Sequence, residues 1–251
     1  WLAPAAPQAA RWLAAASAAR LAYDGRVKAD ADGAALVATA LEFDRSRLAG
    51  AIDWRAETPA GRGKLTVQLR APLIDIDSLP DFRGLAAVSA QDDLDLSLEA
   101  DALRVARIGE APAETGHLRL ALSRADGATM LKDLSIRDLG GANLTGAGRV
   151  TAQGGGFDVR LDAQKLADLA ALVRRVAPGP ASEALAARAH ALSPARLTLG
   201  VATDASGAFT QFNLAGDAAG ARYNMQAQPS GSGRMQARLS VQAPEASTLL
   251  R

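Results

Sequence analysis

The chain has 251 residues, of which 49% are hydrophobic but only 4% are aromatic. Its 28 basic and 27 acidic residues give a net charge of +1, which provides no electrostatic footprint for nucleic acid, so we expect no nucleic-acid partner. The chain has no cysteine, which excludes disulfides and thiolate metal sites and is compatible with either the cytosol or the bacterial periplasm.

The start of the chain predicts an amphipathic helix over residues 8–22, with Trp12 on its apolar side. Charged residues such as Arg11 and Arg20 interrupt the apolar stretch, so we do not expect a signal core or a membrane span here. Because the chain begins with Trp1 and not Met, we expect it to be a piece of a longer protein.

A first series of alternating strands follows and completes a predicted unit over residues 1–82. Spacings of roughly ten residues favour antiparallel hairpins over crossover connections. The expected strands are 35–43, 48–55, 64–71 and 73–79.

A second predicted unit, residues 83–251, holds six more strands, a helical insertion and four closing strands. The insertion spans 164–192, where Leu166, Leu169 and Val173 form a helical stripe and Pro178 ends the first helix. The expected strands are 93–100, 103–108, 117–123, 130–136, 142–152 and 157–163, then 196–202, 208–214, 221–228 and 234–242. We expect both units to form one continuous sheet.

The predicted fold is therefore mainly β: a long curved antiparallel sheet (a meander, groove or incomplete barrel) with an N-terminal helix and the insertion near 164–192. These helices are too short to cover the apolar face of such a sheet, and soluble monomers rarely expose large apolar patches. Either the sheet packs against itself as a sandwich or barrel, or it forms a trough that holds an apolar ligand.

The trough hypothesis places a lipid on the inward side chains of successive strands. Each CH₂ removed from water contributes about 0.8 kcal/mol, so a wall of Leu, Val and Ala would stabilise a long acyl chain. The candidate lipid-groove residues are Leu94, Leu96, Leu98, Leu118, Leu120, Leu122, Leu144, Val150, Val159 and Leu161.

The sequence does not indicate catalysis, a metal site or a cofactor. The two histidines, His117 and His190, lie far apart and lack the neighbours of a triad or a metal site. The carboxylates at 75–77 and 92–95 lack the shaped loop of a Ca²⁺ site, and we interpret them as polar strand faces.

Several of these segments resemble the repeated unit of AsmA-like proteins of Gram-negative bacteria. The most similar part is 131–150, with the pattern Gly-Gly-Ala, apolar, Thr-Gly, small, Gly at 140–148; the segments 94–105, 118–122, 48–54 and 65–79 are similar too. The resemblance implies a periplasmic β-rich protein, anchored to the inner membrane by an N-terminal span outside this chain. It also implies a groove-like bridge that carries phospholipid towards the outer membrane.

The competing hypothesis is a closed β module, structural or for interaction, that assists assembly of outer-membrane proteins and whose apolar face is packed against itself. An outer-membrane barrel fits less well, because the sequence lacks aromatic girdles and contains the helical insertion.

Overall fold

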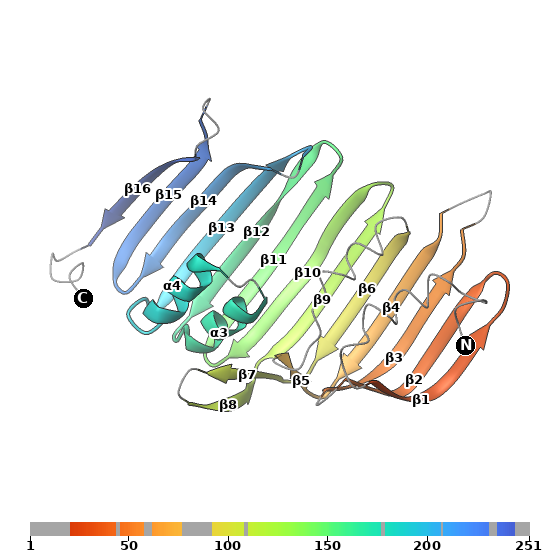
Figure 1. Ribbon diagram of the computed structural model, residues 1–251. Helices are drawn as coiled ribbons and strands as arrows, with labels where there is room; N and C mark the ends of the chain where they lie inside the picture. Colours follow the sequence, from red (N-terminus) through yellow and green to blue (C-terminus); the bar gives the residue numbers. More distant parts are fainter. Residues whose placement is uncertain are drawn as a thin grey trace.

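The computed structural model describes residues 21–43, 46–57, 62–76, 92–107, 110–176, 179–206, 208–230 and 235–243. Over these residues the protein is mainly β, as predicted. One curved sheet of 13 strands forms its body without closing into a barrel (Figure 1). Two helices and a separate three-stranded sheet complete the described part.

The elements have the following bounds. The main sheet contains, in spatial order, β1 (Leu21–Ala29), β2 (Gly33–Phe43), β3 (Ser46–Arg55), β4 (Lys64–Ala71), β6 (Asp93–Ala100), β9 (His117–Ala125), β10 (Ala128–Leu139), β11 (Ala142–Thr151), β12 (Gly154–Ala163), β13 (Ala195–Asp204), β14 (Phe209–Ala218), β15 (Ala221–Pro229) and β16 (Met235–Gln242). The small sheet contains β5 (Ile74–Asp75), β7 (Leu103–Arg107) and β8 (Glu110–Thr115). The helices are α3 (Ala167–Val176) and α4 (Pro180–Arg188), which confirms the predicted insertion.

One pair of strands corrects the antiparallel prediction. β4 and β6 are parallel neighbours, with Leu65 beside Leu94 and Ala71 beside Ala100. A parallel pair needs a long connection, and residues 72–92 provide the length for the chain to return to the same end of the sheet. This pair joins the strands of both predicted units in one sheet.

Other predicted elements differ in extent or partner. The expected strand 73–79 is only the two-residue β5 within the described part, and the strand near 103–108 belongs to the small sheet. Residues 8–20 of the expected N-terminal helix lie outside the described residues. Its last two residues belong to β1, because Leu21 and Ala22 pair with the end of β2, and this long-range pairing overrides the local helical pattern. β1 and β8 were not predicted.

The register of the strands puts the alternating apolar residues of neighbouring strands on one side, which we call the apolar face. Leu98 lies beside Leu120 and Leu120 beside Leu134. Leu131 and Leu134 are three residues apart and would face opposite sides of a regular strand. A β-bulge between them turns both to the apolar face, beside Gly148 and Gly146.

The core lies where the helices and the small sheet cover one end of the apolar face. A row of small residues lies there: Ala142, Ala163, Ala195 and Ala218 are successive cross-strand neighbours and are nearly fully buried. Leu166, Leu169 and Leu172 from the start and inner side of α3 pack into the same core, together with Leu103 and Val105 of β7.

The tight turn between β10 and β11 lies against the start of α3 and gives a first testable prediction. Gly140 has a φ of 59°, and a Cβ there would collide with the buried Asp168 carboxylate. Gly127 in the β9–β10 turn has a φ of 72° but open space around it. We expect Gly140→Ala to destabilise the fold by about 1–3 kcal/mol more than Gly127→Ala in urea unfolding. Equal effects would show that Asp168 moves aside freely.

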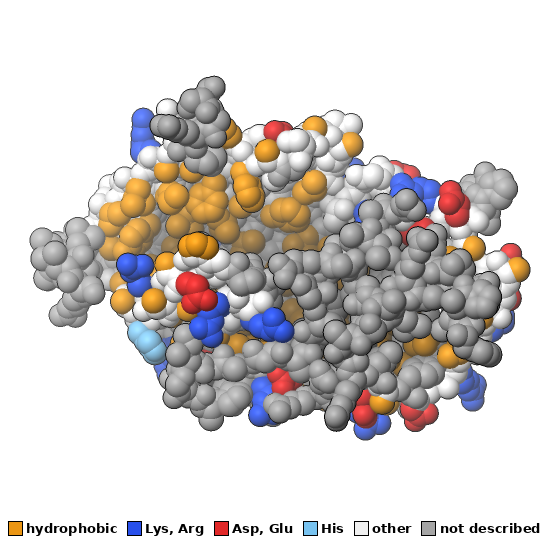
Figure 2. All heavy atoms as spheres, in the orientation of Figure 1, with side chains coloured by type: hydrophobic (Ala, Val, Ile, Leu, Met, Phe, Trp, Pro, Cys, Tyr) orange, Lys and Arg blue, Asp and Glu red, His pale blue; other side chains and the backbone are white. Residues whose placement is uncertain are grey.

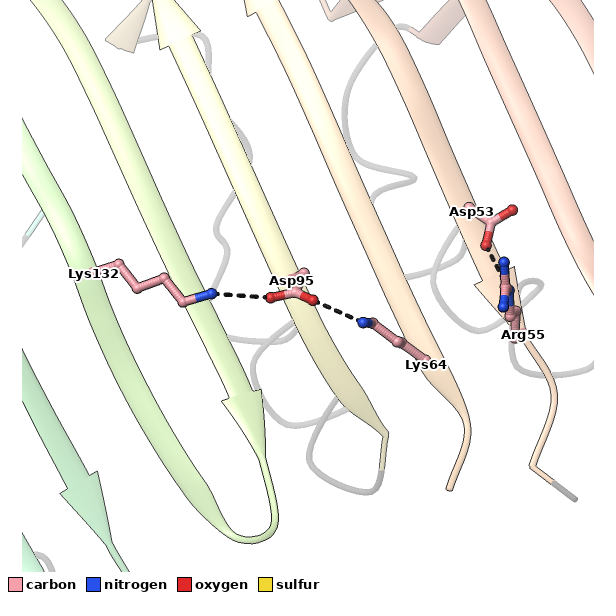
Figure 3. A network of polar contacts seen from close by, with 5 residues as sticks. All are labelled: Asp53, Arg55, Lys64, Asp95 and Lys132. Atoms are coloured by element: carbon pink, nitrogen blue, oxygen red, sulfur yellow. Dashed lines mark hydrogen bonds and ion pairs between the residues drawn. The ribbon is translucent and has the colours of Figure 1, made fainter. Parts of the chain in front are cut away.

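The opposite side of the sheet, which we call the polar face, carries charged side chains that pair across strands. Asp95 of β6 accepts from Lys64 Nζ at 2.9 Å and from Lys132 Nζ at 3.4 Å (Figure 3). Arg119 and Glu99 pair at 3.2 Å, and Arg196 and Asp162 at 3.2 Å. Because these cross-strand pairs are charged, this face of the sheet stays exposed to solvent, and the apolar surface is buried on the other face.

The pairing of Asp95 gives a prediction for pH dependence. The hydrogen bond from Lys64 lowers the pKa of Asp95 below its ordinary value of 3.8. A lowered folded-state pKa means that the stabilisation is present above 3.8 and is lost as the pH falls through the folded-state pKa. We expect Asp95→Asn to lose about 0.2–1 kcal/mol at pH 7, as exposed pairs do, and to match the wild type at the lowest pH. Melting temperatures from pH 7 to 2 check this; a gap that persists in acid would contradict it.

Candidate functional site

All ten residues predicted to line a lipid groove lie on the apolar face, and each is half-buried. They are Leu94, Leu96, Leu98, Leu118, Leu120, Leu122, Leu144, Val150, Val159 and Leu161. The register brings Leu96 beside Leu122, Leu98 beside Leu120, and Leu144 beside Leu161. Side chains from four strands therefore form one surface.

The apolar face extends further than the predicted residues, into the closing strands. Beyond Val159 the same row continues through Leu199, Leu214 and Met225, all half-buried. Figure 2 shows apolar side chains gathered in a hollow beside α4, over the strands near β13 and β14. We call this apolar face between the helices and the far strand ends the groove. The same alternation of apolar and polar residues in 196–202, 208–214 and 221–228 is the sequence signal for these residues.

One of two apolar-face glycines on β11 lowers the floor of the groove. The ring of Phe157 lies over Gly148, its cross-strand neighbour, and occupies the space that a Cβ would need. A Cβ on Gly146 would make only ordinary contacts, with the Asp158 carbonyl oxygen at 3.4 Å and with Leu134 and Val159 at 3.5 Å each. The missing side chain at Gly146 therefore leaves room above the floor, between two apolar walls.

The two long sides of the groove, which follow the strand ends, differ in chemistry. Along one side, Leu139 and the row of alanines are buried in the same core cluster as α3. Along the other side, Trp54, Arg124, Thr129 and Thr203 occupy a single row that runs across the sheet through Leu94 and Val150. We call this row the polar border.

Arg124 is the charged member of the polar border. Its guanidinium donates to the Asp92 carbonyl oxygen from Nε at 3.2 Å and from Nη2 at 2.7 Å. Burial and the nearby Arg62 lower the pKa of Arg124, while Asp92 and Asp93 act in the opposite direction. Because an arginine stays charged in proteins, the border keeps a partly desolvated cation next to the apolar surface.

Two shallow depressions lie on the polar face, behind the groove, with volumes of about 750 and 550 Å³. Ala147 and Gly200 form their shared floor, and Asp158 and Asn213 stand beside it, all at strand positions that alternate with the apolar ones. Their charged, open lining does not suit an acyl chain, so the groove and not these depressions is the candidate lipid site.

The two histidines and the described carboxylates do not form a further candidate site. His117 begins β9 and His190 follows α4, and both are exposed. Within the described ranges, no three His, Asp or Glu side chains are grouped as metal ligands. No helix in the described part is long and apolar enough to cross a bilayer.

The fold and the groove together define an open, curved β-sheet whose apolar face is capped at one end by helices. Comparisons of the chain with protein-family models, with curated proteins and with solved structures find no match.

Proposed function

We propose that this chain is a non-enzymatic segment of an envelope protein whose groove takes up the acyl chains of phospholipids. The observation that carries the proposal is the row of half-buried apolar residues that runs from β6 to β15. Side chains in a dry core would be buried, whereas these remain accessible along the described strands.

The resemblance to AsmA-like proteins supports a cellular setting for this groove. In that setting the parent protein is periplasmic, anchored to the inner membrane of a Gram-negative bacterium, and passes phospholipid towards the outer membrane. Equivalent apolar positions repeat about every 4.8 Å across the sheet, so a lipid can move from strand to strand without reaching a position that binds it much more tightly than the next.

The test is lipid binding and transfer by the whole chain. We expect native mass spectra of protein purified without detergent to show phospholipid adducts. A fluorescent phospholipid should also move faster from donor to acceptor vesicles when the chain is present. A clean apo mass together with no uptake of the fluorescent lipid would instead favour a module that uses its apolar face for other contacts.

A further inference from the structure

In the described strands, the two long sides of the groove end in rows of different chemistry. The polar border presents the Trp54 indole N–H, the Arg124 guanidinium and the hydroxyls of Thr129 and Thr203. The other long side is the alanine row, which belongs to the same core cluster as α3 and whose own side chains offer no hydrogen bond. A guest on this surface therefore meets a polar side and an apolar side.

Two atoms of the polar border have no protein partner in the described part. Trp54 Nε1 and Thr203 Oγ1 are buried and make no hydrogen bond. A buried donor without an acceptor costs free energy, whereas one that meets an acceptor regains it. The indole N–H can only donate, so any group that pairs with Trp54 must be a hydrogen-bond acceptor.

The width of the groove fits a lipid tail laid along the strands. On β13, Thr203 at the border and Ala195 at the alanine row are the two ends of one apolar face. Eight residues of strand span roughly 26 Å. One leaflet of a bilayer has a hydrocarbon thickness of roughly 15 Å, so an acyl chain with its glycerol fits within that span.

We propose that the groove orients its guest: the acceptor-rich phosphate and ester head of a phospholipid lies at the polar border, and the acyl chains run along the strands towards α3 and α4. This inference rests on the proposed function and adds a direction to it. Successive lipids would lie side by side along the sheet, with every head on the side of the β9–β10, β11–β12 and β13–β14 turns (Figure 1).

The absence of native cysteine allows a direct test with single reporters in the full chain. Gln153→Cys places a fluorophore on the exposed β11–β12 turn near the polar border, and Ala186→Cys places one on α4, which packs against the core. Each labelled protein receives phosphatidylcholine that carries a nitroxide quencher either on the head or near the tail end. Native mass spectrometry measures the uptake of each lipid separately.

We expect the head quencher to dim the reporter at 153 at least twofold more than the reporter at 186, and the tail quencher to show the opposite order. Equal or reversed quenching with normal uptake overturns the orientation but leaves lipid binding intact. Absence of uptake of both lipids overturns the proposed function itself, and the orientation with it.

A second variant tests the chemistry of the border. Thr203→Val removes the unpartnered hydroxyl at nearly constant volume. Thr198→Val, which removes a hydroxyl that donates to the Ala215 carbonyl oxygen on the polar face, is the control for the lipid preference. We expect Thr203→Val to raise Tm of the lipid-free protein by about 2 °C and to reduce the preference for phosphatidylcholine over diacylglycerol with the same acyl chains roughly threefold. An unchanged preference contradicts the placement of the head at Thr203, whatever Tm does.

Discussion

Leu199→Asp is expected to reduce phospholipid uptake at least tenfold while the protein remains folded. Leu199 is half-buried in the middle row of the groove, between Val159 and Leu214. A carboxylate here would have to lose its water when an acyl chain covers it, a cost of several kcal/mol, and 1.4 kcal/mol is already a factor of ten in affinity. Without lipid the carboxylate still reaches solvent, so the fold tolerates it.

The neighbouring residue provides the control for this experiment. Thr198→Asp adds the same charge to β13 but on the polar face, where Arg160 is its cross-strand neighbour. We expect near-normal uptake and unfolding for Thr198→Asp in fluorescent-lipid binding and urea unfolding. If both variants bind lipid normally, the groove does not hold the acyl chain; if Leu199→Asp unfolds, the site is a dry core instead.

Leu139→Ala is expected to cause the largest loss of stability among single truncations of the apolar face. Leu139 is completely buried at the end of β10, beside Gly116 and in the same core cluster as α3. Truncation of a buried leucine removes its transfer free energy and leaves a cavity, for a total of about 2–5 kcal/mol. Urea unfolding of the lipid-free protein measures this loss.

An exposed leucine of the same sheet is the matched control for this truncation. Leu239 on the edge strand β16 is 59% exposed, so Leu239→Ala should change the free energy of unfolding by less than about 1 kcal/mol. Similar losses for the two variants would mean that the helix-capped end is not the main core. A large loss of unfolding free energy for Leu139→Ala with retained lipid uptake would show that the core and the groove are distinct regions.

Alternation of apolar and polar residues predicted most of the strands and the side of each that carries the groove candidates. It succeeded for Leu94 to Leu98 and for Leu118 to Leu122 because a regular strand places every second side chain on the same face. Alternation does not hold at Leu131 and Leu134, where a bulge changes the period. Alternation also does not say which residues of neighbouring strands lie side by side, so the row of residues that forms the polar border could not be predicted.

Partners distant in sequence explain the other differences. β4 and β6 are parallel because residues 72–92 carry the chain back, which hairpin spacing cannot indicate. Leu103 and Val105 alternate as the main-sheet strands do, yet they lie in the small sheet that helps to cover the core. Residues 21–22 fit a helical pattern, yet they pair with β2.

The mainly β class, the helical insertion and the two-sided character of the strands follow from the sequence, because all three depend on side-chain periodicity within one segment. The alignment of the rows, the end that the helices cover and the border formed by Thr203, Arg124 and Trp54 become visible only in the folded chain. Those features depend on register and on contacts between segments far apart in the chain, where a shift of one residue would turn each side chain to the other face.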